Sequence, residues 1–433
     1  MTDTTAEGGP EQARMIDRRM ALAREWDELV DQVRALPGFE DFLRPPPLTK
    51  LLPAASDGPV AVINVSRWRC DALLVTSGEV HVQPLPGLRA QEVEERVVEY
   101  LRVLDAAGQT EAEYQAARAA AGSDASAAAE DRLAKATVER LRAGARAEAM
   151  LRLILIWLWE TIAQPVLRAL GLEQTPPEGT KWPRMWWCPT GLLTLLPLHA
   201  AGDHQARGAD RPTVLDRVVS SYTPTLRALV EARETPSRAP AAARLLAVTV
   251  GEVEGEVSLR TVVAERDALR ERFGDQCTVR DGSDATVPEI TKLLPEHRWV
   301  HFSCHGNQYL DDPSRGGLRL FDDVLTIAAI SAGRYEGEFA FLPACKTATG
   351  GFDLADEAIT LAAALHYTGY RHVIGTLWTV FEGTAAKVAR AVYGSDAAEF
   401  DPSLSAGRLH EVQRELRDTD RLSAWTPFTH IGP

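Results

Sequence analysis

Two short stretches of the sequence contain residue types that together can carry out nucleophilic chemistry. HFSCHG at 301–306 ends in a histidine followed by a glycine, and LPACKTATG at 342–350 holds one cysteine among small residues. A thiol with an ordinary pKa of about 8.5 is mostly protonated at neutral pH, so a nucleophilic cysteine needs an imidazole or a helix N-terminus nearby. We therefore expect His305 to act as a general base and Cys345 as a nucleophile.

Both candidates come at the end of an apolar run of strand length, WVHFSC at 299–304 and EFAFLPAC at 338–345. Ligands of open α/β sheets bind at the carboxyl edge of the strands. If the two strands are neighbours, His305 and Cys345 reach the same edge. Gly306 has no side chain, so its backbone N–H and that of Cys345 can face a developing oxyanion.

Other interpretations of these residues are weighed against this one. A single buried cysteine is usually a small apolar residue, which applies to Cys345 as well. Cys304 is an alternative nucleophile, but strand alternation directs it away from the face of His301 and His305, which favours a packing role. The same alternation separates the histidines from Cys304 as zinc ligands. We expect neither a metal nor another cofactor.

The rest of the chain supplies the elements that position these residues. Residues 172–433 alternate strand-like runs with helical patterns, which predicts a mostly parallel sheet with helices on its faces. The strand candidates are 185–189, 244–250, 276–281, 299–304, 338–345 and 372–378. The helix candidates are 259–273, 287–294, 325–332, 354–369 and 383–394. The stretch 307–323, rich in Gly, Asp and Pro, is expected to be a loop.

The N-terminal part has a different composition. Residues 1–10 are polar and small and are expected to be disordered, and 11–36 look helical. Three strand-like runs at 58–65, 71–77 and 79–86 predict a small hairpin or meander, and 89–171 predicts two or three helices interrupted at 122–126. The apolar run 151–167 is too short to span a membrane and indicates a buried helix. We expect 11–171 to be a smaller region, either regulatory or an inactive half of the same kind of fold as 172–433, without a visible 34-residue repeat.

Composition narrows the classes of function. A chain of 433 residues with 45% hydrophobic and 25% charged residues is typical of a globular protein. A net charge of -14 repels a phosphate backbone, so direct nucleic-acid binding is not expected. The N-terminus lacks the pattern of a signal peptide, and five scattered cysteines do not indicate a disulfide framework. We expect a cytoplasmic protein that does not enter a membrane.

Several motifs in order resemble the CHAT domain family of the caspase and separase clan, in particular its actinobacterial and fungal members. They are WVHFSCHG, FLPACKTATG, the segment from LADEAITLAAALHYTG to GTLWTV, and a terminal WTPFTHIGP. The upstream segments MWWCPTGLLTLLPLHAAG and SSYTPTLRAL are similar too. The resemblance covers about residues 180–433 and implies a caspase-like three-layer α/β/α sandwich with a mostly parallel sheet.

The resemblance also implies an activity, a cysteine endopeptidase with His305 as base, Cys345 as nucleophile, and an oxyanion hole at Gly306 and Cys345. Where many family members carry an aspartate that lines the S1 pocket, this chain has Glu382, which favours cleavage after a basic residue. Glu382 and Asp353 are equally interpretable as first-turn acids of helices. Family analogy further implies a protein substrate, a separate activator or sensor protein, and a role in bacterial antiviral defence or programmed death.

Two other classes of function are kept beside the protease. A pseudo-protease would use the same fold as a binding module or scaffold, although both predicted dyad residues are present. An acyltransferase or deamidase would use the same nucleophile and base. Product analysis separates these enzymes from a protease, since only the protease creates a new N-terminus.

Overall fold

The computed structural model describes residues 10–40, 42–123, 126–206, 211–235, 244–253, 262–307, 315–343, 360–380, 382–394 and 400–433. The chain divides into two compact units, Met1–Leu51 and Leu52–Pro433. The N-terminal unit contains one long helix, α1 (Pro10–Arg34), and a short one, α2 (Leu48–Leu51). The expected helix at 11–36 is thus confirmed.

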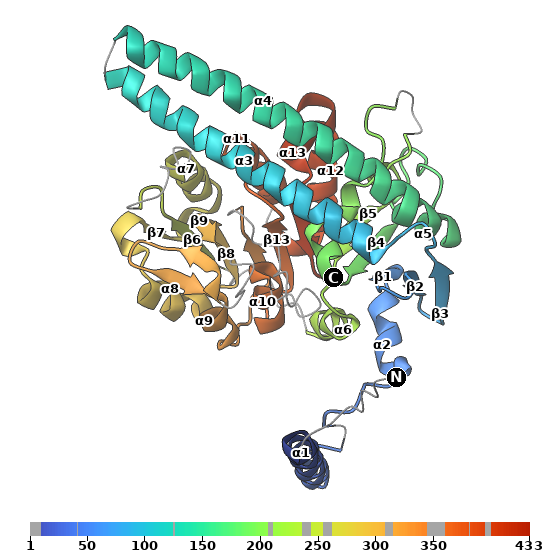
Figure 1. The fold of residues 1–433 in the computed structure, drawn as a ribbon. Coiled ribbons are helices and arrows are strands. Elements are labelled where there is room, and N and C mark those ends of the chain that lie inside the picture. Colours follow the sequence, from blue (N-terminus) through green and yellow to red (C-terminus); the bar gives the residue numbers. More distant parts are fainter. Residues whose placement is uncertain are drawn as a thin grey trace, which may run out of the picture. The chain divides into compact units, whose positions relative to one another are not determined.

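The main unit is built on an eleven-stranded, mostly parallel sheet (Figure 1). Its strands, in spatial order, are β3 (Val80–Pro84), β2 (Asp71–Val75), β1 (Val60–Asn64), β4 (Arg184–Pro189), β5 (Val219–Tyr222), β14 (Phe428–Ile431), β13 (His372–Thr376), β12 (Phe339–Phe341), β8 (Trp299–Ser303), β6 (Leu245–Thr249) and β7 (Cys277–Asp281). The antiparallel pairs are β1–β2, β2–β3 and β13–β14. All nine strands predicted from the sequence are present.

Every residue of β6, β8, β12 and β13 is buried, as expected for parallel strands covered on both faces. Two strands of the sheet were not predicted, β5 and β14. Both contain buried polar residues: Ser221 of β5 hydrogen-bonds His430 of β14, with Oγ and Nδ1 2.8 Å apart. Because these polar side chains satisfy each other inside the protein, the strands lack the apolar pattern by which strands are recognised.

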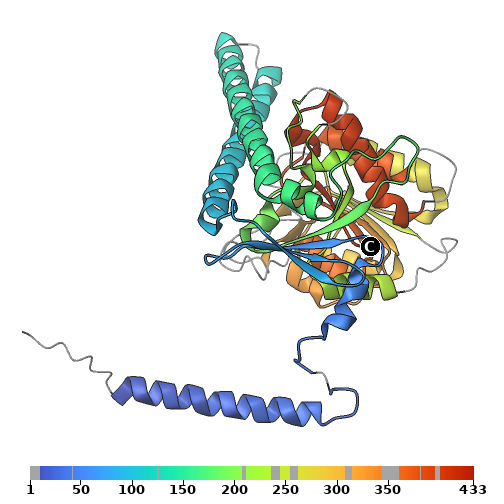
Figure 2. The same cartoon turned by 90° about the vertical axis from the view of Figure 1, so that its right-hand side faces the viewer.

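Helices cover both faces of the sheet, which confirms the three-layer sandwich (Figure 2). On one face α10 (Leu361–Thr368) packs with α9 (Ile327–Ser331) and α6 (Leu226–Glu234). On the other, α11 (Glu382–Tyr393) packs with α12 (Ser405–Thr419), and α7 (Val262–Phe273) reaches α11 through Arg272, whose Nε donates to the carbonyl of Gly394 at 3.0 Å. Helices α8 (Val287–Leu293) and α13 (Leu422–Trp425) also belong to this unit's C-terminal half.

A long helical hairpin projects from this body (Figures 1 and 2). It consists of α3 (Ala90–Ser123) and α4 (Ala127–Leu158), so the predicted break at 122–126 is confirmed. Ser126 caps α4 by accepting a hydrogen bond from the N–H of Ala129. A π-helical turn, Trp159–Ala163, joins α4 to α5 (Gln164–Ala169).

The helical run Ala127–Ala169 is, among the described residues, the one that length and composition would allow to cross a membrane. Half of its most apolar window is buried inside the protein. Leu151, Leu155, Leu158, Ile162 and Val166 are all fully buried, which confirms that this run is a core helix.

The region after β8 differs from the expected loop. A second, three-stranded antiparallel sheet forms from β9 (His305–Asn307), β10 (Gly317–Arg319) and β11 (Val324–Thr326). A side chain at Gly317 would collide with the backbone of Leu325, so glycine is required where these strands pack. The Gly-rich composition thus reflects close strand packing as well as turns.

The eleven-stranded sheet continues across residue 171, where we expected the N-terminal region to end, because β1 pairs directly with β4. The expected division at 11–171 and 172–433 stays a prediction about the roles of these regions.

Candidate active site

The candidate active site lies where β8 and β12 end. These strands are parallel neighbours, with Phe341 of β12 opposite His301 of β8. His305 and Cys345 each follow their member of this pair at the same sequence separation. Both chain segments therefore leave the sheet at the same edge, the arrangement required for a shared site. Residues 344–359, including Cys345 and Asp353, lie outside the described residues.

His305 is the first residue of β9 and leads the chain from the main sheet into the second one. It is half-buried and pairs with Arg319 of β10, and the buried Gly306 pairs with Leu318. Cys304, between the two sheets, is only 4% exposed and belongs to the hydrophobic core. This burial supports a packing role for Cys304, because a nucleophile must meet its substrate.

The third predicted contributor follows β13, the other parallel neighbour of β12. Ile374 of β13 is opposite Phe341, and the N–H of Leu342 donates to the carbonyl of Ile374 at 2.8 Å. Helix α11 then begins at Glu382. Three adjacent parallel strands, β8, β12 and β13, therefore lead to His305, Cys345 and Glu382 in that order.

A buried polar network involves two residues of β8, His301 and Ser303, which shortly precede His305 in the chain. His301 is fully buried, its Nδ1 lies 3.0 Å from the hydroxyl of Tyr393, and its Nε2 lies 3.0 Å from Ser303 Oγ. Ser303 Oγ in turn donates to the carboxylate of Glu265 on α7, and another oxygen of that carboxylate is 3.5 Å from His301 Nε2. The network joins β8 to α7 and α11 just before the chain reaches His305.

Opposing effects set the ionisation of Glu265. Burial raises the pKa of this carboxyl, but the charge of His301 and the hydrogen bonds from His301 and Ser303 outweigh burial, so the net pKa is lowered. A buried carboxylate thus lies beside a buried imidazole. Glu265 and Tyr393 were missed in the sequence, although polar His301 and Ser303 within an apolar strand were a signal that buried partners exist.

The segment between β13 and α11 is held by the base of the hairpin. Trp378 is 3% exposed, its ring meets that of Tyr100 of α3 edge to face at 5.4 Å, and its Nε1 donates to the carbonyl of Ser423 at 3.4 Å. Glu148 of α4 accepts from the backbone N–H groups of Leu422 and Ser423, both at 3.0 Å. The hairpin thereby fixes the chain that leads to Glu382.

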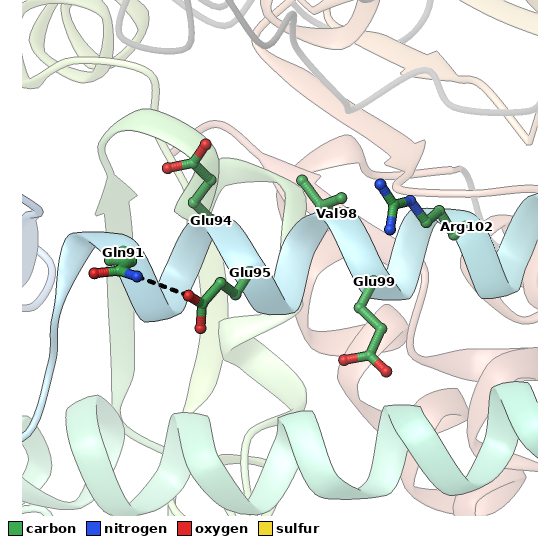
Figure 3. Close-up of a pocket in the computed structure, with 6 residues that line it drawn as sticks. All are labelled: Gln91, Glu94, Glu95, Val98, Glu99 and Arg102. Atoms are coloured by element: carbon green, nitrogen blue, oxygen red, sulfur yellow. Dashed lines mark hydrogen bonds between the residues drawn. The ribbon is translucent and has the colours of Figure 1, made fainter.

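A surface hollow occurs elsewhere, on α3 (Figure 3). Its lining comes from one helix and includes three glutamates: Gln91, Glu94, Glu95, Val98, Glu99 and Arg102. The side-chain amide of Gln91 donates to Glu95 at 2.9 Å. None of these residues supplies the thiol or imidazole of the predicted chemistry, so this hollow is separate from the candidate active site.

Comparison with known proteins places the chain among cysteine peptidase folds. The sequence model of the CHAT domain matches residues 152–433. Two structures of the Saccharomyces cerevisiae separase–securin complex are similar over 89% of this chain, with a TM-score of 0.57 and 9% identity. The chain spans 31% of the separase chain in one and 30% in the other.

The complex of Porphyromonas gingivalis RgpB pro- and mature domains is similar over 66% of this chain and 76% of that chain, with a TM-score of 0.43 and 10% identity. No curated protein matches the chain in sequence.

Proposed function

The chain belongs to the CHAT domain family and has a caspase-like fold, and from this premise we propose that it is a cysteine endopeptidase with His305 as general base and Cys345 as nucleophile. The observation that carries the proposal is the parallel pairing of β8 with β12, in which His301 and Phe341 are opposite each other. This register supports a common position for the two residues beyond the strand ends.

The proposed reaction follows from the residue chemistry. His305 takes the proton of the Cys345 thiol, and the thiolate attacks the carbonyl carbon of a peptide bond. The backbone N–H groups of Gly306 and Cys345 stabilise the negative oxygen that develops. The imidazolium of His305 then protonates the leaving amine, and a thioester remains on Cys345. Water activated by His305 hydrolyses the thioester and restores the thiol.

Glu382 is proposed to line the S1 pocket and Asp353 to contribute less. A carboxylate there binds an Arg or Lys side chain of the substrate by charge-assisted hydrogen bonds. The position of Glu382 at the start of α11, after the third adjacent strand, supports this role. The side chain of glutamate is one methylene longer than that of aspartate. Its carboxylate can therefore bind a basic side chain that enters the pocket slightly less deeply.

The setting of the proposed protease is cytoplasmic, with a protein substrate and a separate activator or sensor protein. Its proposed biological role is cleavage of an effector in antiviral defence or programmed death. Support for these points comes from family analogy and from the charge of -14, which disfavours direct nucleic-acid binding.

The test is covalent labelling by an arginyl acyloxymethyl ketone, with the adduct measured by intact mass. The native chain, Cys345→Ala and the matched Cys304→Ala variant are compared. We expect one adduct on the native chain and on Cys304→Ala, and none on Cys345→Ala. Labelling that persists in Cys345→Ala would show that another residue is the nucleophile.

If the native chain stays unlabelled, the same comparison is made in a lysate of the source cells, which supplies an activator. Labelling there that depends on Cys345 supports a latent protease. Continued absence of an adduct from the lysate-treated native chain counts against the proposal and favours a pseudo-protease.

A further inference from the structure

Helix α1 of the N-terminal unit carries an apolar face that no described residue of that unit covers. Met15, Leu22, Trp26 and Leu29 are 63%, 56%, 59% and 51% exposed, although their side chains are large and apolar. A single helix in water is only marginally stable, and a contiguous exposed apolar patch marks an interaction site. We therefore expect a partner to cover this apolar face of α1.

The spacing of these side chains fits a partner that is itself a helix. Met15, Leu22 and Leu29 recur every seven residues, and Trp26 and Val33 form a second row with the same spacing between them. This alternation of three and four residues is the a/d pattern by which two helices pack side by side.

The charges of α1 are divided between its two halves. The half before Leu22 is basic, with three arginines (Arg14, Arg18, Arg19) against Glu11 and Asp17. The half after Leu22 is acidic, with four acids (Glu25, Asp27, Glu28, Asp31) against Arg24 and Arg34. Among the charged side chains that the structure describes here, Arg34 is half-buried and the others are exposed. These charges can therefore interact with the charges of a partner.

We propose that α1 pairs with α1 of a second copy of this chain in an antiparallel arrangement, so that the protein forms a homodimer. Antiparallel pairing about Leu22 places the basic half of each helix against the acidic half of the other, whereas parallel pairing places like charges together. It also brings Arg19, the charged residue in the apolar rows, toward the half that contains Trp26, a ring that can accept a cation.

Charge distinguishes this occupant from a membrane surface. Helices that lie on membranes carry Lys and Arg along their polar face, which attract anionic lipids. The acidic second half of α1 would be repelled by such lipids. A second copy of α1 offers opposite charge to both halves of the helix. An anionic lipid surface would attract only the basic half.

The first experiment measures the mass of the full chain by sedimentation velocity over a range of concentrations. We expect a dimer for the native protein and a dissociation constant at least about a hundredfold higher for Leu22→Asp, because the substitution enters the interface twice. Leu141→Asp, at a similarly exposed leucine of α4 (49%), is the matched control and should dimerise like the native chain.

A native chain that is monomeric throughout, or a Leu22→Asp variant that dimerises as well as the native chain, overturns the proposal. Two further readouts then identify the true occupant. Protection of α1 in hydrogen exchange of the monomer indicates docking on the same chain, and cosedimentation with vesicles of phosphatidylcholine and phosphatidylserine indicates a membrane.

Charge variants test the pairing without touching its apolar rows. One variant makes the first half acidic (Arg14→Glu, Arg18→Glu), and the other makes the second half basic (Glu25→Lys, Glu28→Lys, Asp31→Lys). Each variant alone should be a monomer, and an equimolar mixture should form a heterodimer. Dimers of either variant alone that are as tight as the native dimer contradict the proposal.

Orientation is read by crosslinking with a short bismaleimide. In an antiparallel pair Met15→Cys protein crosslinks to Leu29→Cys protein but not to itself, since two copies of residue 15 then lie about 21 Å apart along the axis. The native chain treated in the same way accounts for its own cysteines. Efficient crosslinking of Met15→Cys to itself alone would show parallel pairing and overturn the antiparallel arrangement.

Discussion

His301 of β8 and Phe341 of β12 are opposite each other in parallel register, and their rings stack with centroids 5.1 Å apart and planes 7° from parallel. One face of the imidazole thus packs on Phe341, while its nitrogens meet Tyr393 and Ser303. The contact stabilises the pairing of the two strands that lead to His305 and Cys345. The segments that carry the predicted dyad therefore begin in the hydrophobic core of the sheet.

Substitution of His301 should mainly lower the stability of the protein, whereas substitution of His305 should mainly abolish its reaction with the probe. His301→Ala leaves a cavity and removes the imidazole beside the buried Glu265 carboxylate, so we expect the free energy of unfolding to fall by about 3–5 kcal/mol. His305→Ala, at a half-buried position, should cost about 1 kcal/mol or less and abolish labelling by the arginyl ketone. Urea unfolding and intact mass measure the two effects. A His305→Ala variant that is labelled at the native rate would contradict its role as base.

A second prediction concerns pH and His410. Burial and the nearby Arg414 lower the pKa of His410 to about 3, and its Nε2 has no hydrogen-bond partner among the described residues. The folded protein therefore keeps this imidazole neutral, whereas the unfolded chain binds a proton below about pH 6.5. The stability that His410 contributes is present above that pH and is lost as pH falls toward the folded pKa.

The measurement is urea unfolding of the native chain and of His410→Leu at about pH 7.5 and about pH 5.5. Leucine cannot titrate, so the native chain should lose about 1.3 kcal/mol more than the variant between these pH values. Equal losses in the two proteins would mean that His410 is protonated in the folded state.

The sequence was sufficient for the parts of the site that follow from periodicity. Apolar runs predicted β8, β12 and β13, and the rule that parallel strands end at a common edge then grouped His305 with Cys345, whereas Glu382 was named from the family resemblance alone. Because the rule needs only strand identity and order, the edge was predictable without any side-chain contact.

Contacts between distant parts of the chain were not predictable in this way. Glu265 meets Ser303 across two elements, and its own helix shows only a charged residue in an amphipathic pattern. The second sheet was missed because Gly317 and its neighbours have loop composition, although the glycine is needed for close packing. The roles of Cys345 and Asp353 stay predictions, because both lie outside the described residues.

Reversing the charge of Glu382 tests the proposed S1 pocket. In Glu382→Lys the site would repel an arginyl probe, so we expect labelling by the arginyl ketone to slow by at least about tenfold, whereas a leucyl ketone should react as fast or faster. Arg390→Glu, a charge reversal later in the same helix, is the matched control. Equal slowing with both probes would indicate damage to the dyad, and no slowing would assign Glu382 to the helix start alone.

The last prediction links the hairpin to the same edge of the sheet. Glu148 accepts two backbone N–H groups at the start of α13, and Ser423 there accepts from Trp378, which precedes Glu382. Glu148→Ala leaves those N–H groups without their carboxylate, so we expect a loss of about 1–3 kcal/mol in unfolding free energy. Glu139→Ala, at an exposed acid earlier in α4, should change stability by about 0.5 kcal/mol or less. If Glu148 also positions the segment that leads to Glu382, its variant should label more slowly with the arginyl ketone than with the leucyl ketone, and an equal rate for both probes would limit Glu148 to a role in stability.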